Sequence, residues 1–229
     1  MKEKIRIILV AGTVLVALIA VALLVPENAL ERRDTGLSSE EIAQQEEVIS
    51  ESREAIRDFD RREEENDKAY YNEYMIIGNA SARIGDLRAA RSAYENAIEY
   101  TEDPQEAIRA IYDMEAEAEN YDRARDVLVE ATENHPENFA YWNLLIELEK
   151  NQFDVGGEEL KARIEQAIEA TDRATGSLVT YAYYLEDQGE FEEALQYWQE
   201  AAALNPQYDA IYAEQIARLE ALINEENNQ

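Results

Sequence analysis

The sequence predicts an all-α protein, an α-solenoid in which pairs of helices stack one after another. The composition supports this class, because 46% of the 229 residues are hydrophobic and 31% are charged, with only 8 glycines and 4 prolines. A pattern of small and large apolar residues also returns about every 34 residues over residues 69–208. These observations, with one long apolar run near the N-terminus, predict a transmembrane helix, a charged helix, about four helix pairs and a C-terminal capping helix, in that order.

Residues 1–25 are expected to form an N-terminal transmembrane anchor. Residues 7–25 are apolar and uncharged, and as a helix they would span about 28 Å, enough to cross the hydrocarbon core of a bilayer. Basic residues precede this run, so the positive-inside rule predicts a single-pass protein with a cytoplasmic N-terminus and an extracytoplasmic repeat domain. The alternative is a cleaved signal peptide, because Ala20-Val21-Ala22 has the form of a cleavage site. The length of the run favours the anchor.

A tether over residues 26–37 and a charged spacer helix over residues 38–68 are expected next. Ser38 and Glu41 have the spacing of a capping box, which favours a helix start there. A seven-residue spacing that would suit a coiled coil joins Ile42, Ile49 and Ile56. Polar residues occupy the companion positions, so we interpret the helix as a spacer or as a helix that packs on the first repeat. A homodimeric coiled coil is the alternative.

Three sets of positions carry the repeat. The first set has members 34, 36 and 34 residues apart, namely Ala90, Ala124, Leu160 and Ala194. The sets that follow four and seven residues later are Tyr94, Leu128, Ile164 and Trp198, and Ala97, Ala131, Ala167 and Ala201. Positions i, i+4 and i+7 share one helix face, and a small residue there lets a neighbouring helix approach closely. The pattern therefore predicts packed helix pairs.

With these residues the chain resembles the tetratricopeptide repeat (TPR) family, whose helix pairs have this period. Four units follow in phase, at residues 71–104, 105–138, 139–174 and 175–208. The third unit departs from the pattern at Leu160, where alanine is usual. The resemblance implies the fold of the segment from 69 to 208 and says little about chemistry.

Each unit is expected to be an antiparallel helix pair. The predicted helices cover residues 69–84, 87–100, 105–118, 121–134, 138–151, 157–171, 177–188 and 191–204. A capping helix over residues 209–224 would cover the end of the array, because the last unit has no following neighbour. A disordered tail over residues 225–229 is expected after it.

The charge of the chain limits the choice of partners. The formal net charge is −30 at pH 7, which repels phosphate backbones, so no nucleic acid partner is expected. Basic proteins or cations suit this charge better, and the alternative is that acidic faces only solvate the array. The chain has no cysteine, which excludes disulfides and thiolate metal sites.

No arrangement of residues points to catalysis, so the chain is predicted not to be an enzyme. The single histidine, His135, precedes Pro136 in an expected turn and has no Ser/His/Asp arrangement to serve. The nearest candidate for a calcium loop, Asp154 to Glu159, lacks the full set of alternating oxygen ligands. We therefore predict no metal and no cofactor.

The resemblance implies instead that the first helix of each pair lines a concave, partner-binding groove. The expected groove residues are Asn72, Met75, Asn79, Arg83, Arg109, Asp113, Asn143, Glu147, Lys150, Asn151, Tyr183 and Glu186. The same reasoning also places Glu117 and Val179 on this side. Asparagine amides both donate and accept, so they could bind the backbone of an extended peptide. The family's clamp for a C-terminal carboxylate is incomplete, because its Lys or Asn positions hold Met75, Ala110 and Ala140.

We therefore interpret the chain as a membrane-anchored, non-enzymatic TPR adaptor that binds a partner protein or peptide in this groove, within an envelope or secretion assembly. One alternative is a structural spacer or self-assembling scaffold that acts through the helix at residues 38–66. A further alternative is an accessory subunit of an enzyme complex. The sequence does not fix the oligomeric state.

Overall fold

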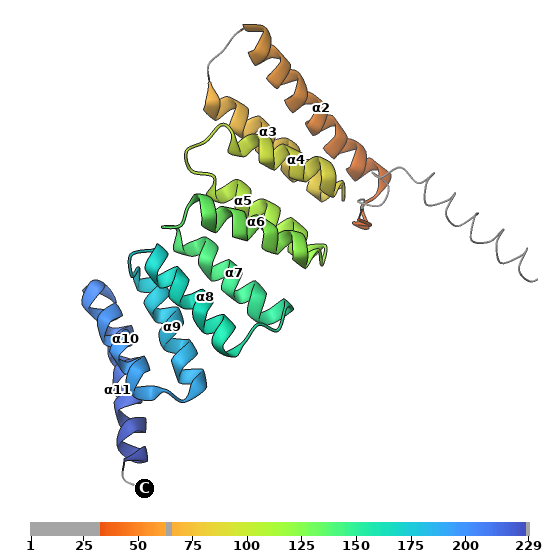
Figure 1. The fold of residues 1–229 in the computed structure, drawn as a ribbon. Coiled ribbons are helices and arrows are strands. Elements are labelled where there is room, and N and C mark those ends of the chain that lie inside the picture. The colour runs from red at the N-terminus through yellow and green to blue at the C-terminus, as the bar shows by residue number, and fades with distance from the viewer. Residues whose placement is uncertain (1–32, 63–65, 228–229) are drawn as a thin grey trace, which may run out of the picture. The chain divides into compact units, whose positions relative to one another are not determined.

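The computed structural model describes residues 33–62 and 66–227 (Figure 1). Over these residues the chain forms ten α-helices and one short 3-10 helix, with no β-strand. The prediction of an all-α fold is therefore confirmed for the described part of the chain. The helices divide between two compact units, and the boundary along the chain falls between Ala118 and Glu119, inside the second expected repeat.

The first unit contains four described helices: α2 (Ser39–Arg62), α3 (Asp67–Arg83), α4 (Leu87–Ile98) and α5 (Gln105–Glu117). The capping box at the start of α2 is formed, because the Ser38 N–H donates to Glu41 Oε2 over 2.8 Å. The charged helix is shorter than expected, because a new N-cap begins α3: Asn66 Oδ1 accepts a hydrogen bond from the N–H of Ala69. Asp67 and Lys68 therefore belong to α3.

Helix α2 packs on the first helix pair. Ile49 and Ile56 of α2 are buried in one core cluster with Tyr70, Ile77 and Ala80 of α3. Two of the three isoleucines in the seven-residue spacing are thus covered within the chain. This favours the packing helix among the interpretations of this segment.

The repeat positions explain how α3 and α4 approach so closely. A Cβ atom on Gly78 of α3 would lie 2.3 Å from the ring of Tyr94 on α4, so only glycine fits against this tyrosine. On the same helix face, Ala90 and Ala97 have no exposed surface. The alternation of small and large residues read from the sequence is thus the packing pattern between these helices.

The second unit contains the remaining elements: α6 (Tyr121–Asn134), α7 (Phe139–Gln152), α8 (Gly157–Ala170), α9 (Thr175–Gln188), α10 (Phe191–Leu204), η2 (Pro206–Tyr208) and α11 (Asp209–Glu226). Helices that follow one another here pack together, and α7 also packs on α9. One hydrophobic core cluster reaches from α7 to α11 and includes Trp142, Ile164, Leu178, Tyr181, Trp198 and Leu219.

Helix α11 packs on α10, as expected of a capping helix, and extends to Glu226. Its inner side buries Tyr212 and Leu219, whereas Ile211 is 59% exposed. The helix thus completes the core of the second unit and leaves polar residues and a few apolar ones at the surface.

The predicted localisation needs correction. No helix in the described ranges is both long enough and apolar enough to span a bilayer. The longest of them, α2 with 24 residues, has many charged side chains along its length. The expected anchor at residues 7–25 lies outside the described residues. The prediction of a single-pass membrane protein with an extracytoplasmic repeat domain therefore has no support in the structure, and we do not retain it.

Candidate functional site

Each unit contains a cavity of about 560 Å³ on the helices that the resemblance assigns to a groove. In the second unit the cavity lies between α7 and α9, and we call it the α7–α9 cavity. In the first unit it lies between α3 and α5, and we call it the α3–α5 cavity. Both volumes fall in the range of ordinary ligand pockets.

The α7–α9 cavity has an apolar floor and a polar rim. Its floor consists of Phe139, Ile146, Leu160, Ile164, Val179 and Tyr184. Its rim includes five of the expected groove residues: Asn143, Glu147, Lys150, Asn151 and Tyr183. Helical periodicity explains the rim, because positions 143, 147 and 150 follow the i, i+4, i+7 spacing of a single face of α7.

The polar contacts across the rim are open to solvent. Asn143 Nδ2 donates to Glu147 Oε1 over 3.1 Å. Lys150 Nζ donates to Asp187 Oδ2 over 3.4 Å, which links α7 to α9. The side chains of Lys150 and Asp187 are 55% and 65% exposed, so this ion pair stabilises the fold little and can exchange for contacts with a ligand.

Tyr183 offers an aromatic surface to this cavity. It is 50% exposed, and its ring contacts Trp198 edge-on, with 5.0 Å between the ring centroids. Trp198 is buried, so it supports the tyrosine from below. In the floor of the cavity, the Tyr184 hydroxyl donates to the carbonyl oxygen of Gly157 over 3.0 Å, and burial raises the pKa of Tyr184.

Glu186, also expected in the groove, lies outside the α7–α9 cavity. Its carboxylate accepts a hydrogen bond from Trp198 Nε1 over 2.7 Å and forms an ion pair with Arg218 of α11. Only 11% of its side chain is exposed. The residue therefore joins α9, α10 and α11 rather than facing a ligand.

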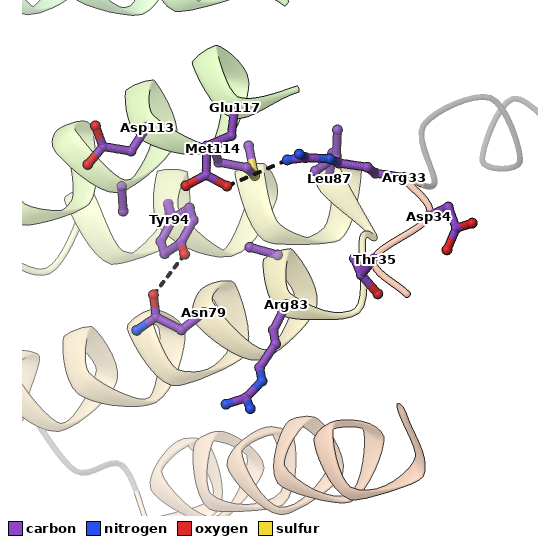
Figure 2. Close-up of a pocket in the computed structure, with 12 residues that line it drawn as sticks. Arg33, Asp34, Thr35, Asn79, Arg83, Leu87, Tyr94, Asp113, Met114 and Glu117 are labelled. Atoms are coloured by element: carbon purple, nitrogen blue, oxygen red, sulfur yellow. Dashed lines mark hydrogen bonds and ion pairs between the residues drawn. The ribbon is translucent and has the colours of Figure 1, made fainter. Parts of the chain in front are cut away.

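The α3–α5 cavity is more polar (Figure 2). Four residues expected on the groove side line it: Asn79, Arg83, Asp113 and Glu117. Tyr94 donates its hydroxyl hydrogen to Asn79 Oδ1 over 2.8 Å, as the dashed line in Figure 2 shows, and burial raises the pKa of Tyr94 to about 12. Arg109 lies beside the cavity, where its Nε atom donates to both carboxylate oxygens of Asp113 at 2.9 Å.

A segment outside the repeats also lines the α3–α5 cavity. Arg33, Asp34 and Thr35 lie at its edge in Figure 2. The Arg33 N–H donates to the carbonyl oxygen of Gly85 over 2.9 Å, and Arg33 Nη1 lies 3.5 Å from Glu117 Oε2. Sequence reasoning missed these residues, because it assigned residues 26–37 to a tether and no local signal ties Arg33 to Gly85.

Two further expected groove residues lie outside both cavities. Met75 is only 7% exposed, so it is a core residue rather than a groove residue. Asn72 is exposed on α3 but does not line the α3–α5 cavity. Residues that line the α7–α9 cavity but were missed include Phe139 and Asp187. A rule that selects polar positions one helical turn apart could have found Asp187, which follows Tyr183 by four residues.

The described residues contain no group of three or more His, Asp or Glu side chains placed to hold a metal ion. His135 lies in the turn between α6 and α7, and the centroid of its ring is 6.1 Å from the centroid of the Tyr141 ring. The cavities in both units are built from side chains on packed helices.

Comparison with known proteins supports the repeat and does not identify a function. No curated protein matches the chain. Among solved structures, it is similar to the MamA protein, with 14% identity, a TM-score of 0.44, and coverage of 66% of this chain and 80% of that one. It is also similar to a tetratricopeptide repeat protein from Parabacteroides merdae ATCC 43184, with 15% identity, a TM-score of 0.42, and coverage of 75% and 66%. MamA from Desulfovibrio magneticus RS-1 gives 14% identity and a TM-score of 0.39, with coverage of 76% and 99%. The tetratricopeptide repeat family model matches residues 177–208, so the resemblance expected from the sequence is confirmed for the unit formed by α9 and α10.

Proposed function

We propose that the chain is a non-enzymatic adaptor that binds an extended segment of a partner protein on the first helices of its repeats. The observation that carries this proposal is the α7–α9 cavity, where five residues that the family resemblance assigns to a groove gather around an apolar floor. A cavity with an apolar floor and a few polar groups at its rim is the usual form of a binding site.

The rim chemistry suits a peptide backbone. The amides of Asn143 and Asn151 each offer a donor and an acceptor, which can pair with the C=O and N–H groups of an extended strand. Tyr183 adds a half-exposed ring on a rigid support, and tyrosines of this kind often contribute much of the affinity of an interface.

The self-assembling scaffold is less well supported. A coiled coil through α2 would need its apolar edge free, but Ile49 and Ile56 are buried against α3. For this reason the adaptor remains our proposal.

Site-specific crosslinking tests the adaptor. A photoreactive amino acid is placed at Tyr183 and, as a control, at the exposed Glu169 of α8, which does not line the cavity. We expect one discrete crosslinked protein from position 183 and none from position 169 in cells that express the full chain. With that protein purified, Tyr183→Ala combined with Asn143→Ala should weaken binding at least about tenfold, the loss expected for a central aromatic contact. Equal crosslinking from both positions would contradict the proposal.

A further inference from the structure

The α7–α9 cavity carries more negative than positive charge at its rim. Among its lining residues, all of which the structure describes, the acidic ones are Glu147 and Asp187, and the basic one is Lys150. Lys150 is already paired with Asp187 at 3.4 Å. Glu147 accepts a hydrogen bond from the neutral amide of Asn143, which leaves its charge unbalanced by a lining cation.

The floor of the same cavity can take a large apolar side chain. Ile146, Leu160 and Ile164 are at most 5% exposed and form a closed base, while Tyr183 stands half-exposed beside it. Tyr183, Phe139 and Val179 retain exposed surface around this base. Packing of an aromatic or long aliphatic group on them removes apolar surface from water on both partners, which is the main favourable term in binding.

The net charge of the whole chain also favours a basic ligand. A net charge of −30 attracts cationic segments toward the surface before contact and repels anionic ones. The exposed carboxylates of Glu147 and Asp187 then offer specific partners for guanidinium or ammonium groups.

We propose that the α7–α9 cavity selects an extended peptide segment in which a large apolar or aromatic side chain lies next to Arg or Lys. The apolar side chain enters the cavity, and the cation pairs with Glu147 or displaces Lys150 from Asp187. This inference rests on the proposed adaptor function and adds the chemical class of its ligand.

The α3–α5 cavity differs in chemistry, which limits the inference to the second unit. Two cations, Arg33 and Arg83, line that cavity beside three carboxylates, those of Asp34, Asp113 and Glu117. Glu117 already lies 3.5 Å from Arg33, and Asp113 accepts a hydrogen bond from Arg109. A basic ligand would therefore have to displace arginines from these carboxylates.

Short synthetic peptides test the selection on the full chain by fluorescence anisotropy. One peptide places Trp between arginines, a second places Trp between glutamates, and a third replaces the Trp of the first by Ala. We expect measurable binding of the first peptide alone, with an affinity that falls as salt is added. Tyr183→Ala should weaken this binding.

A pair of charge-reversal variants distinguishes the effect of the cavity carboxylates on peptide binding from the effect of the net charge of the chain. The variant Glu147→Lys/Asp187→Lys is compared with Glu133→Lys/Glu192→Lys, which changes the net charge equally at exposed positions on α6 and α10 outside the cavity. The first variant should lose the preference for the basic peptide, by up to about fivefold for each carboxylate, whereas the second should keep it. Circular dichroism checks that both variants remain helical.

Several outcomes would overturn the inference. Equal losses in the two charge variants would mean that only the net charge attracts the peptide. Equal binding of the acidic and basic peptides, with loss in Tyr183→Ala, would reject the ligand class and leave the adaptor in place. No binding of any peptide would also reject the ligand class. Crosslinking from position 183 does not depend on peptide charge, so it tests the adaptor separately.

Discussion

Gly85 is under two separate backbone constraints in the turn between α3 and α4. Its φ angle is +78°, in the left-handed region that only glycine occupies without strain. A Cβ atom on this residue would also lie 2.0 Å from the carbonyl oxygen of Arg33. The turn and the attachment of the N-terminal segment therefore both require glycine at this position.

Gly85→Ala should consequently destabilise the first unit in two ways. Left-handed strain alone costs about 1–2 kcal/mol, and the contact with Arg33 must also be relieved by movement of the segment at Arg33. The matched control is Gly36→Ala, where φ is +68° and no atom lies within 4 Å of the added Cβ. Urea unfolding followed by circular dichroism should show a larger loss for Gly85→Ala. Equal losses in the two variants would mean that the contact with Arg33 contributes nothing.

Glu115 of α5 is a carboxylate without any exposed surface, and it depends on Arg91 of α4. Arg91 Nε donates to Glu115 Oε1 over 2.6 Å. Breaking such a pair on one side costs about 3–5 kcal/mol, because the remaining charge stays buried, whereas replacing both partners by apolar residues is far less harmful. We therefore expect Arg91→Leu, which removes the cation beside the fully buried Glu115 carboxylate, to lower the free energy of unfolding more than Glu115→Leu, which leaves an arginine that is 20% exposed. Arg91→Leu/Glu115→Leu should recover much of the loss. If the double variant is as unstable as the sum of the single variants, the two residues act independently.

At the scale of helices, α2 is held by apolar contacts with α3. Ile56 is 9% exposed and packs in the cluster that contains Tyr70 and Ile77. Ile56→Ala should cost about 2–5 kcal/mol, the usual result of deleting a buried aliphatic side chain. Replacement of the exposed Glu54 by Ala is the control on the same helix. Sedimentation should show the same mass for both variants and the wild type, whereas a mass change with Ile56→Ala would favour the coiled coil.

Helical periodicity explains which parts of the site the sequence could predict. It assigns Asn143, Glu147 and Lys150 to one face of α7, and the structure places these residues on the rim of one cavity. Glu186 was also expected in the groove, but Arg218 reaches this residue from another helix, 32 positions later in the chain. Periodicity describes a helix in isolation, so it fails where a distant segment covers a face.

The same limit applies to Met75 and Arg33. The family resemblance places Met75 in the groove, but tertiary packing buries it to 7% exposure. Arg33 belongs to a segment without periodicity, and only the fold brings its backbone to Gly85. The repeat positions were more reliable, because Ala90, Ala124 and Ala194 have no exposed surface and serve the helix packing for which their small size suits them.

At the scale of the whole molecule, stability should depend on pH through its tyrosines. The chain contains 14 of them. Burial, together with a hydrogen bond to Glu106, raises the pKa of Tyr71 to about 12. Burial alone raises the pKa of Tyr94 to about 12, and burial is also the main cause of the raised pKa of Tyr181. These phenols are neutral in the folded chain at pH values where an unfolded tyrosine already ionises.

The direction of this pH dependence follows from the numbers of protons that the folded and unfolded chains bind. Below about pH 10 a tyrosine keeps its proton in both states, so it adds no pH dependence. Above this pH the unfolded chain releases protons that the folded chain retains, so the free energy of unfolding falls as the pH rises toward 12. Urea unfolding at a series of alkaline pH values should show this decline. Tyr94→Phe should make it less steep, although loss of the hydrogen bond to Asn79 lowers stability at neutral pH. Tyr183→Phe, at a half-exposed ring, controls for the loss of a phenol. If Tyr94→Phe has the same slope as the wild type, Tyr94 does not remain protonated in the folded chain above pH 10.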